Sequence, residues 1–174
     1  MQATSTASAF HTFLDYLNVP VQGIIVPQKV YTSHTLVTSS PREPIRFSSQ
    51  GGAGVNLQSV ITSNFHGLAN GEQHTPPPDN NGTLAICIHW PGYSPYQKAI
   101  PLNKITGKLT YRMLALITAK AIQQWMLEVH RHNIQSTEPN ADWSIGSVKF
   151  ESLWLLELRQ ISTGLWQPVL FRDI

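Results

Sequence analysis

Aromatic and basic side chains alternate between residues 90 and 120, and no carboxylate lies between Asp79 and Glu128. The side chains that could act together are Trp90, Tyr93, Tyr96, Lys98, Lys104, Lys108, Arg112 and Lys120. Rings that stack on bases, combined with cations that meet phosphates, hold single-stranded nucleic acid without reading its sequence. The pattern indicates a candidate ligand-binding surface, for nucleic acid or another polyanion.

The same residues also have a plainer interpretation. In it the aromatic side chains pack half-buried against the core, and the lysines form a solvated rim around them. The formal net charge is only +2, which is too small to class the whole chain as a nucleic-acid binder. The sequence leaves both interpretations open.

Residues that could build a catalytic or metal site are present, but their spacing does not favour either. The ten carboxylates are scattered, and no pair is spaced to share one helical face for acid–base work. His130 and His132 are two residues apart, so on a helix they point in different directions. We therefore predict no metal and no cofactor. An enzyme of unrecognised, hydrolase-like class would use His66 or His89, and the sequence favours a non-enzymatic protein over it.

The single cysteine, Cys87, lies in an apolar run from residue 84 to residue 90 that reads as a buried strand. One cysteine allows no disulfide within the chain. His89 lies two residues after Cys87, on the same face of the strand, where it could act as the base that activates the thiol. Apolar surroundings raise the pKa of a thiol, which argues against a nucleophile here.

A long amphipathic helix over residues 110–132 is the best-defined element. Thr110 is a good N-cap, and Leu114, Ile117, Ala121 and Trp125 form one apolar stripe along it. His130, Arg131 and His132 close the last turn, where positive charge suits the negative end of the helix dipole. Burial of the stripe is what would stabilise this helix.

Other elements are predicted from shorter patterns. A helix over 5–17 forms an N-terminal arm, 1–20, that ends at Pro20, and a short central helix is expected over 55–64. Strands are expected over 23–26, 29–37 and 45–48, with prolines that favour sheet edges. Residues 67–83, which include three consecutive prolines, form a flexible loop. Residues 147–174 form a hairpin that turns at 162–164, with Trp154, Leu156 and Leu158 on one face and Pro168 marking an edge strand.

A succession of short motifs gives the chain a resemblance to a known family. The motifs lie at residues 24–27, 44–47, 54–57, 64–68, 89–93, 114–115 and 162–168. The most specific are Trp-Pro-Gly-Tyr at 90–93 and the element that closes with Trp-Gln-Pro at 166–168. Together they resemble a family of small proteins from mushroom-forming (basidiomycete) fungi. The resemblance implies a fungal, intracellular setting and one domain; that family has no established activity to carry over.

The sequence thus predicts one α+β domain over residues 1–174, with a mainly antiparallel sheet packed against the long helix. The absence of a basic leader or long apolar run predicts no signal peptide, no membrane span and a cytoplasmic or nuclear location. Charged residues are only 13% of the chain, so copies repel one another weakly. We expect a non-enzymatic protein-interaction module that binds a protein partner or forms a homo-oligomer. Nucleic-acid or polyanion binding is the first alternative.

Overall fold

The computed structural model describes residues 23–29, 42–50, 52–65, 67–75, 82–104, 108–137 and 141–174. The strands and helices in these ranges, in chain order, are β1 (Gly23–Ile25), β2 (Ile45–Arg46), β3 (Ser48–Ser49), β4 (Gly52–Ala53), β5 (Val55–Asn56), α2 (Leu57–Ile61), β6 (Thr83–Ile88), β7 (Tyr96–Pro101), η1 (Leu102–Lys104), α3 (Tyr111–Arg131), η2 (Ala141–Trp143), η3 (Phe150–Ser152), β8 (Leu153–Ser162) and β9 (Leu165–Asp173). The predicted arm 1–20, and most of the strand predicted over 29–37, lie outside the described residues.

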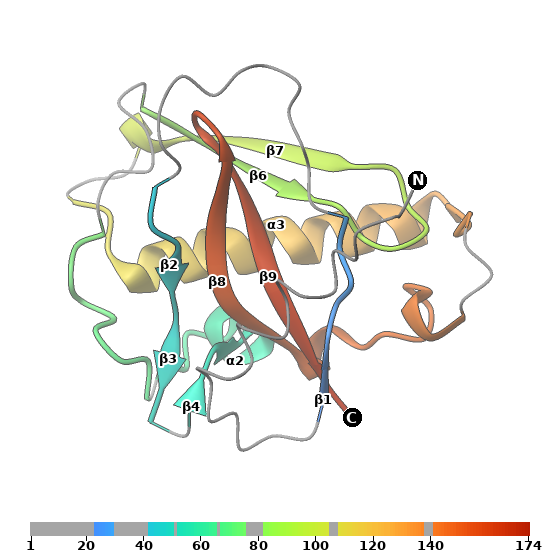
Figure 1. Cartoon of the computed structure of the whole chain (residues 1–174), viewed down its shortest axis with the longest axis horizontal. Coiled ribbons are helices and arrows are strands. Elements are labelled where there is room, and N and C mark those ends of the chain that lie inside the picture. The colour runs from blue at the N-terminus through green and yellow to red at the C-terminus, as the bar shows by residue number, and fades with distance from the viewer. Residues whose placement is uncertain are drawn as a thin grey trace, which may run out of the picture.

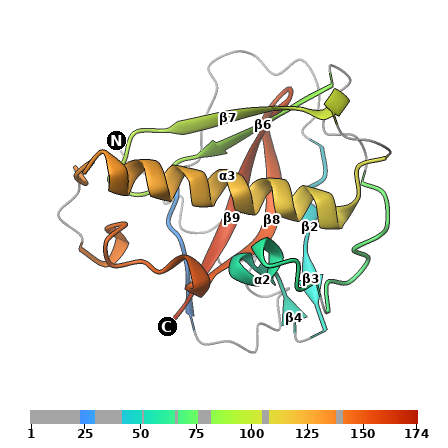
Figure 2. The ribbon, with the colours of Figure 1, turned by 180° about the vertical axis from the view of Figure 1, so that it is seen from behind.

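The described elements form two layers, a sheet and a helical layer on one of its faces (Figures 1 and 2). The sheet has seven strands in the order β2-β8-β9-β6-β7, with β1 added to β9 and β5 added to β8; β3 and β4 form a separate pair. Among the strand pairs of the described residues, β6–β9 alone is parallel. The predicted combination of α and β structure, with a mostly antiparallel sheet and one long helix, is confirmed.

Helix α3 begins and ends where local chemistry predicts. The Thr110 side chain accepts a hydrogen bond from the Met113 N–H at 3.2 Å, which caps the first turn. At the other end Asn133 adopts a positive φ of 49°, and the Ile134 N–H returns to the Val129 carbonyl. This closure satisfies carbonyls that the last turn would otherwise leave unpaired.

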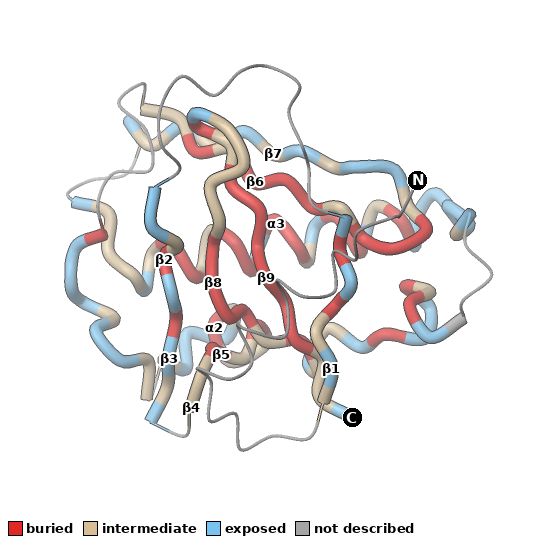
Figure 3. Tube along the Cα trace, in the orientation of Figure 1, coloured by how far each residue is buried: buried red, intermediate tan, exposed pale blue. Residues whose placement is uncertain are grey.

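The core lies between α3 and the sheet (Figure 3). Apolar side chains from β6, β8 and β9 meet the buried stripe of α3, and they bring together residues far apart in the sequence. The largest fully buried side chains are Trp90, Trp166, Leu57, Leu84, Ile86, Ile88, Leu114, Ile122, Leu153, Leu155, Leu158 and Leu170. Of the predicted stripe, Leu114, Ala121 and Trp125 are buried, whereas Ile117 is only partly buried at its margin.

The predicted central helix over 55–64 is too long. Helix α2 covers only Leu57–Ile61, and Val55 and Asn56 instead pair with β8 as strand β5. Asn56 makes the switch because its side chain accepts from the Ser59 N–H and donates to the Glu151 carbonyl. A residue that caps a helix cannot lie inside it, so the helix starts after Asn56.

A β-bulge in β8 overturns the predicted faces of the C-terminal hairpin. The pairing with β9 shifts between Leu155 and Glu157, and one extra residue reverses the alternation of side chains. Leu158 consequently joins the core beneath α3, while Leu156, with Trp154 packed against it, belongs to a cluster separate from that core. The turn itself falls where expected, at Thr163 and Gly164, where Gly164 adopts a positive φ of 74°.

Pro168 was expected to mark an edge strand, and this prediction is wrong because β9 lies inside the sheet. On one side Pro168 pairs with Leu158 of β8. On the other side β9 pairs with β6 before Pro168 and with β1 after it, so Pro168 lies in a gap between these two strands. Gln28 bridges this gap: its amide donates to the Pro168 carbonyl at 2.6 Å and accepts from the His89 N–H at 3.1 Å. A proline is tolerated because its missing N–H faces a side chain rather than a strand.

We predict that Leu114→Ala lowers the free energy of unfolding by about 2–5 kcal/mol, because its side chain is completely buried and truncation leaves a cavity. Ile117→Ala is expected to cost less, since Ile117 only borders the core. Urea titration of both variants checks the order. Equal losses would contradict it.

We also predict that Gln28→Met lowers the free energy of unfolding by about 1–3 kcal/mol, because it leaves the Pro168 carbonyl and the His89 N–H unpaired at nearly constant volume. The control is Gln73→Met, at an exposed position. Thermal melts of the two variants provide the comparison, and a Gln28 variant as stable as the control would refute the bridging role.

Candidate functional site

Trp90, the first residue of the predicted binding surface, belongs to the core. It is 1% exposed, and its ring lies 5.5 Å from that of Trp125 and 6.1 Å from that of Trp143. Its indole N–H donates to the Trp143 carbonyl at 2.7 Å. The indole therefore has no face left for a ligand to stack on.

Tyr93 is also committed to the protein. Its ring packs edge-on against Trp125 at 5.9 Å, and its hydroxyl accepts from the Ile145 N–H at 3.1 Å. The Gly92 carbonyl accepts from both the backbone and the side chain of Thr137. The Trp-Pro-Gly-Tyr element thus anchors the chain that follows α3.

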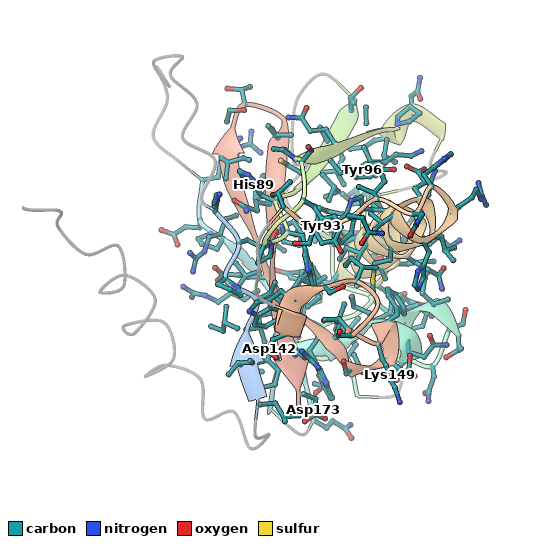
Figure 4. All side chains as sticks on the ribbon, turned by 90° about the vertical axis from the view of Figure 1, so that its right-hand side faces the viewer. His89, Tyr93, Tyr96, Asp142, Lys149 and Asp173 are labelled. Carbon is teal, nitrogen blue, oxygen red and sulfur yellow. The ribbon has the colours of Figure 1, made fainter. Side chains whose placement is uncertain are left out.

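Tyr96, Lys98 and Lys120 lie on two elements that run side by side, β7 and α3 (Figures 1 and 2). Figure 4 views the end of the molecule where β6 leads into β7 and shows Tyr93 and Tyr96 on the side of α3. Burial raises the pKa of Tyr96, and the nearby Glu128 carboxylate raises it further. Within the described residues Lys98 and Lys120 form no ion pair.

Arg112 is separated from these residues because it lies at the beginning of α3. Its guanidinium pairs with Glu72 at 3.1 Å and lies over the Phe65 ring at 4.2 Å, in a cleft of about 390 Å³. Lys108 precedes the helix and is exposed, and Lys104 ends η1. Among the predicted residues whose side chains the structure describes, Trp90 is buried in the core and Arg112 lies in a separate cleft.

The beginning of α3 offers no anion site. The N–H groups of Tyr111 and Arg112 donate to the carbonyls of Gln73 and Gly71, and those of Met113 and Leu114 donate to Thr110. A helix N-terminus attracts phosphate through unpaired N–H groups, and these four are all taken.

The Cys87–His89 pair does not form an activated nucleophile. Burial raises the pKa of the Cys87 thiol, although a hydrogen bond with Gln97 lowers it in part. Burial also lowers the pKa of His89, and the charge of Lys29 lowers it further. The described residues contain no group of three side chains that could hold a metal ion. His66, the other histidine considered for a hydrolase, lies outside the described part of the chain.

A buried carboxylate that the sequence did not reveal lies on the sheet face away from α3. Glu157 is completely buried; one oxygen bonds the Arg159 guanidinium, and the other is 3.7 Å from the Arg46 Nε. Removing Arg159, the closer partner, would leave the buried carboxylate with only the more distant Arg46. The pairing with two arginines supports a structural role for Glu157.

A groove of about 320 Å³ between α2, α3 and residues 145–151 was also missed. Its lining residues are Gln58, Gln123, Met126, Leu127, His130, Ile145, Gly146, Val148, Lys149, Phe150 and Glu151. Leu127 lies at its rim and is 55% exposed. One signal could have found it, since Leu127 is an apolar residue on the otherwise polar face of the helix.

Comparisons with protein-family models, with curated proteins and with solved structures find no match to this chain. The resemblance to a fungal family and the expected location therefore stay predictions. No helix in the described residues is both long and apolar enough to cross a membrane.

We predict that His89 makes the protein less stable in acid. Because the pKa of His89 is lowered in the fold, the unfolded chain takes up the proton more readily, and stability falls as pH drops through about 6.5. His89→Gln should reduce the loss of melting temperature between about pH 7.5 and about pH 5.5. An unchanged pH dependence in the His89 variant would contradict this.

Proposed function

We propose that this chain is a non-enzymatic protein-interaction module that self-associates through the groove beside Leu127. The observation that carries the proposal is an exposed leucine at a groove that combines apolar side chains with polar and charged ones. The floor of this groove includes Met126, Ile145 and Val148, which are already largely withdrawn from water. A second apolar side chain entering it would remove water from surfaces on both partners.

The neighbouring positions of leucine and groove suit two-fold symmetry. In a two-fold dimer the same patch must be complementary to itself, so Leu127 of each copy would fill the groove of the other. Burying a leucine side chain fully is worth roughly 1.5–3 kcal/mol, and symmetry supplies this gain twice. The exposed Leu127 would thereby lose its contact with water.

The charges around the groove support the same arrangement. Its rim carries Lys149 and Glu151, side chains of opposite sign that lie two residues apart. A two-fold axis would allow each to meet its opposite on the other copy. The small net charge of +2 adds little repulsion between copies.

The alternatives have weaker support. A nucleic-acid surface loses Trp90 to the core and has the Tyr93 hydroxyl committed to Ile145, which removes stacking platforms it would need. An enzyme would require an activated nucleophile or an acid–base pair, and none of the described histidine, cysteine and carboxylate arrangements supplies one.

We predict that the wild-type protein forms a dimer at micromolar concentration and that Leu127→Asp abolishes it, because the variant loses the apolar contact with Met126, Ile145 and Val148 and its carboxylate would have to leave water. Sedimentation velocity over a concentration series measures the dimer. The melting temperature should stay near that of the wild type, since residue 127 is exposed.

The matched control is Ile24→Asp on β1, at an apolar position that is 44% exposed and lies opposite Arg172. It should leave the dimer intact. A wild-type protein that stays monomeric, or a Leu127→Asp variant that dimerises like the wild type, would refute self-association through this groove.

A further inference from the structure

Strand β7 is an open edge of the sheet within the described residues, because it pairs only with β6. Antiparallel strands alternate residues that bond the neighbour with residues whose backbone groups point away from it. The Leu102 N–H bonds the Gly82 carbonyl, so even-numbered positions of β7 face β6. Gln97 and Ala99 therefore direct their N–H and carbonyl groups outward.

The outward groups at Gln97 and Ala99 are accessible. Both residues are exposed, and neither has a further backbone partner among the described residues. Pro101 has no N–H, so it limits this edge at its C-terminal end. Such a row of backbone groups is a template on which an extended segment can add as a new strand.

Side chains on the helix side of β7 determine which segment fits. Tyr96, Lys98 and Ile100 share that face, because they pair with the core residues Ile88, Ile86 and Leu84. In a sheet, residues directly opposite on one face interact most strongly. An added strand would therefore present an apolar, an acidic and an apolar side chain at alternate positions to Tyr96, Lys98 and Ile100.

The charge around this edge favours an acidic segment. Lys98 on β7 has no ion-pair partner within the described residues. The Glu128 carboxylate lies near Tyr96, at the beginning of the strand, and accepts a hydrogen bond from Gln124. A second copy pairing through the same edge would bring Lys98 close to its like-charged counterpart. The edge thus suits a different chain better than a second copy of this one.

We infer that β7 binds an extended acidic segment of a protein partner by strand addition, with a carboxylate of that segment opposite Lys98. This site lies apart from the groove at Leu127, so it does not depend on self-association. Backbone hydrogen bonds hold the segment to Gln97 and Ala99, and Lys98 selects its charge.

The test uses a fluorescent peptide with the alternating core Val-Thr-Glu-Thr-Val and a second peptide with Lys in place of Glu, followed by fluorescence anisotropy. The wild-type protein should bind the acidic peptide at least about tenfold more tightly, the factor that 1.4 kcal/mol supplies. Ala99→Pro should weaken binding by about tenfold or more, because it removes one outward N–H while the bonds to β6 stay.

Lys98→Glu should transfer the preference to the lysine peptide, and the exposed Lys108→Glu should leave the acidic peptide's affinity unchanged.

Amide hydrogen exchange on the wild-type protein gives a result that does not depend on whether Ala99→Pro folds. The acidic peptide should slow exchange at Gln97 and Ala99. Unchanged exchange at both residues would overturn the inference, as would equal affinity for the two peptides. If exchange at Gln97 and Ala99 slows as the protein concentration rises, without any peptide, the edge would instead bind a second copy. Tight binding of heparin that Lys98→Glu abolishes and Ala99→Pro leaves intact would assign the site to polyanions.

Discussion

The Trp90 indole connects three segments that are far apart in the sequence, through its buried hydrogen bond to the Trp143 carbonyl and its ring contact with Trp125. Trp90 follows β6, Trp125 lies in α3, and Trp143 ends η2, and their rings pack together around that bond. A donor in so apolar a setting costs about 1–3 kcal/mol if it is left unpaired. The segment after α3 therefore has to return to the sheet at this point.

Both proposed surfaces follow from that junction. The Tyr93 hydroxyl and the Ile145 N–H form a second bond beside it, which places Ile145 and Val148 as one wall of the groove. On its other side the chain turns through Pro91 and Gly92 and starts β7, the open edge. A change at Trp90 would consequently disturb the groove and the edge together, even though Trp90 touches no ligand at either.

The sequence allowed the prediction of those elements whose periodicity is long. Helix α3 and the C-terminal hairpin were predictable because alternation or a capped stripe extends over many residues. The bulge at Leu155–Glu157 and the Gln28 bridge were not, because each depends on a residue distant in the chain. The aromatic residues show the same limit. The sequence placed Trp90 and Tyr93 among alternating aromatic and basic residues, but only tertiary packing could distinguish a buried indole from an exposed stacking platform. Leu127 was detectable in principle, although its groove is completed by residues 145–151.

The two surfaces lie on opposite sides of α3, with β7 beyond one side of the helix and α2 beyond the other (Figure 2). A dimer joined through Leu127 would therefore leave the β7 edge of each copy open. Two edges held at a fixed separation bind a partner with two acidic segments more tightly than either edge alone, because the second contact becomes intramolecular. The low charge content, 13% of the chain, strengthens this argument. Where few charges compete, Lys98 would contribute strongly to the local field along β7, and the carboxylates of the proposed partner would have few alternative places to bind.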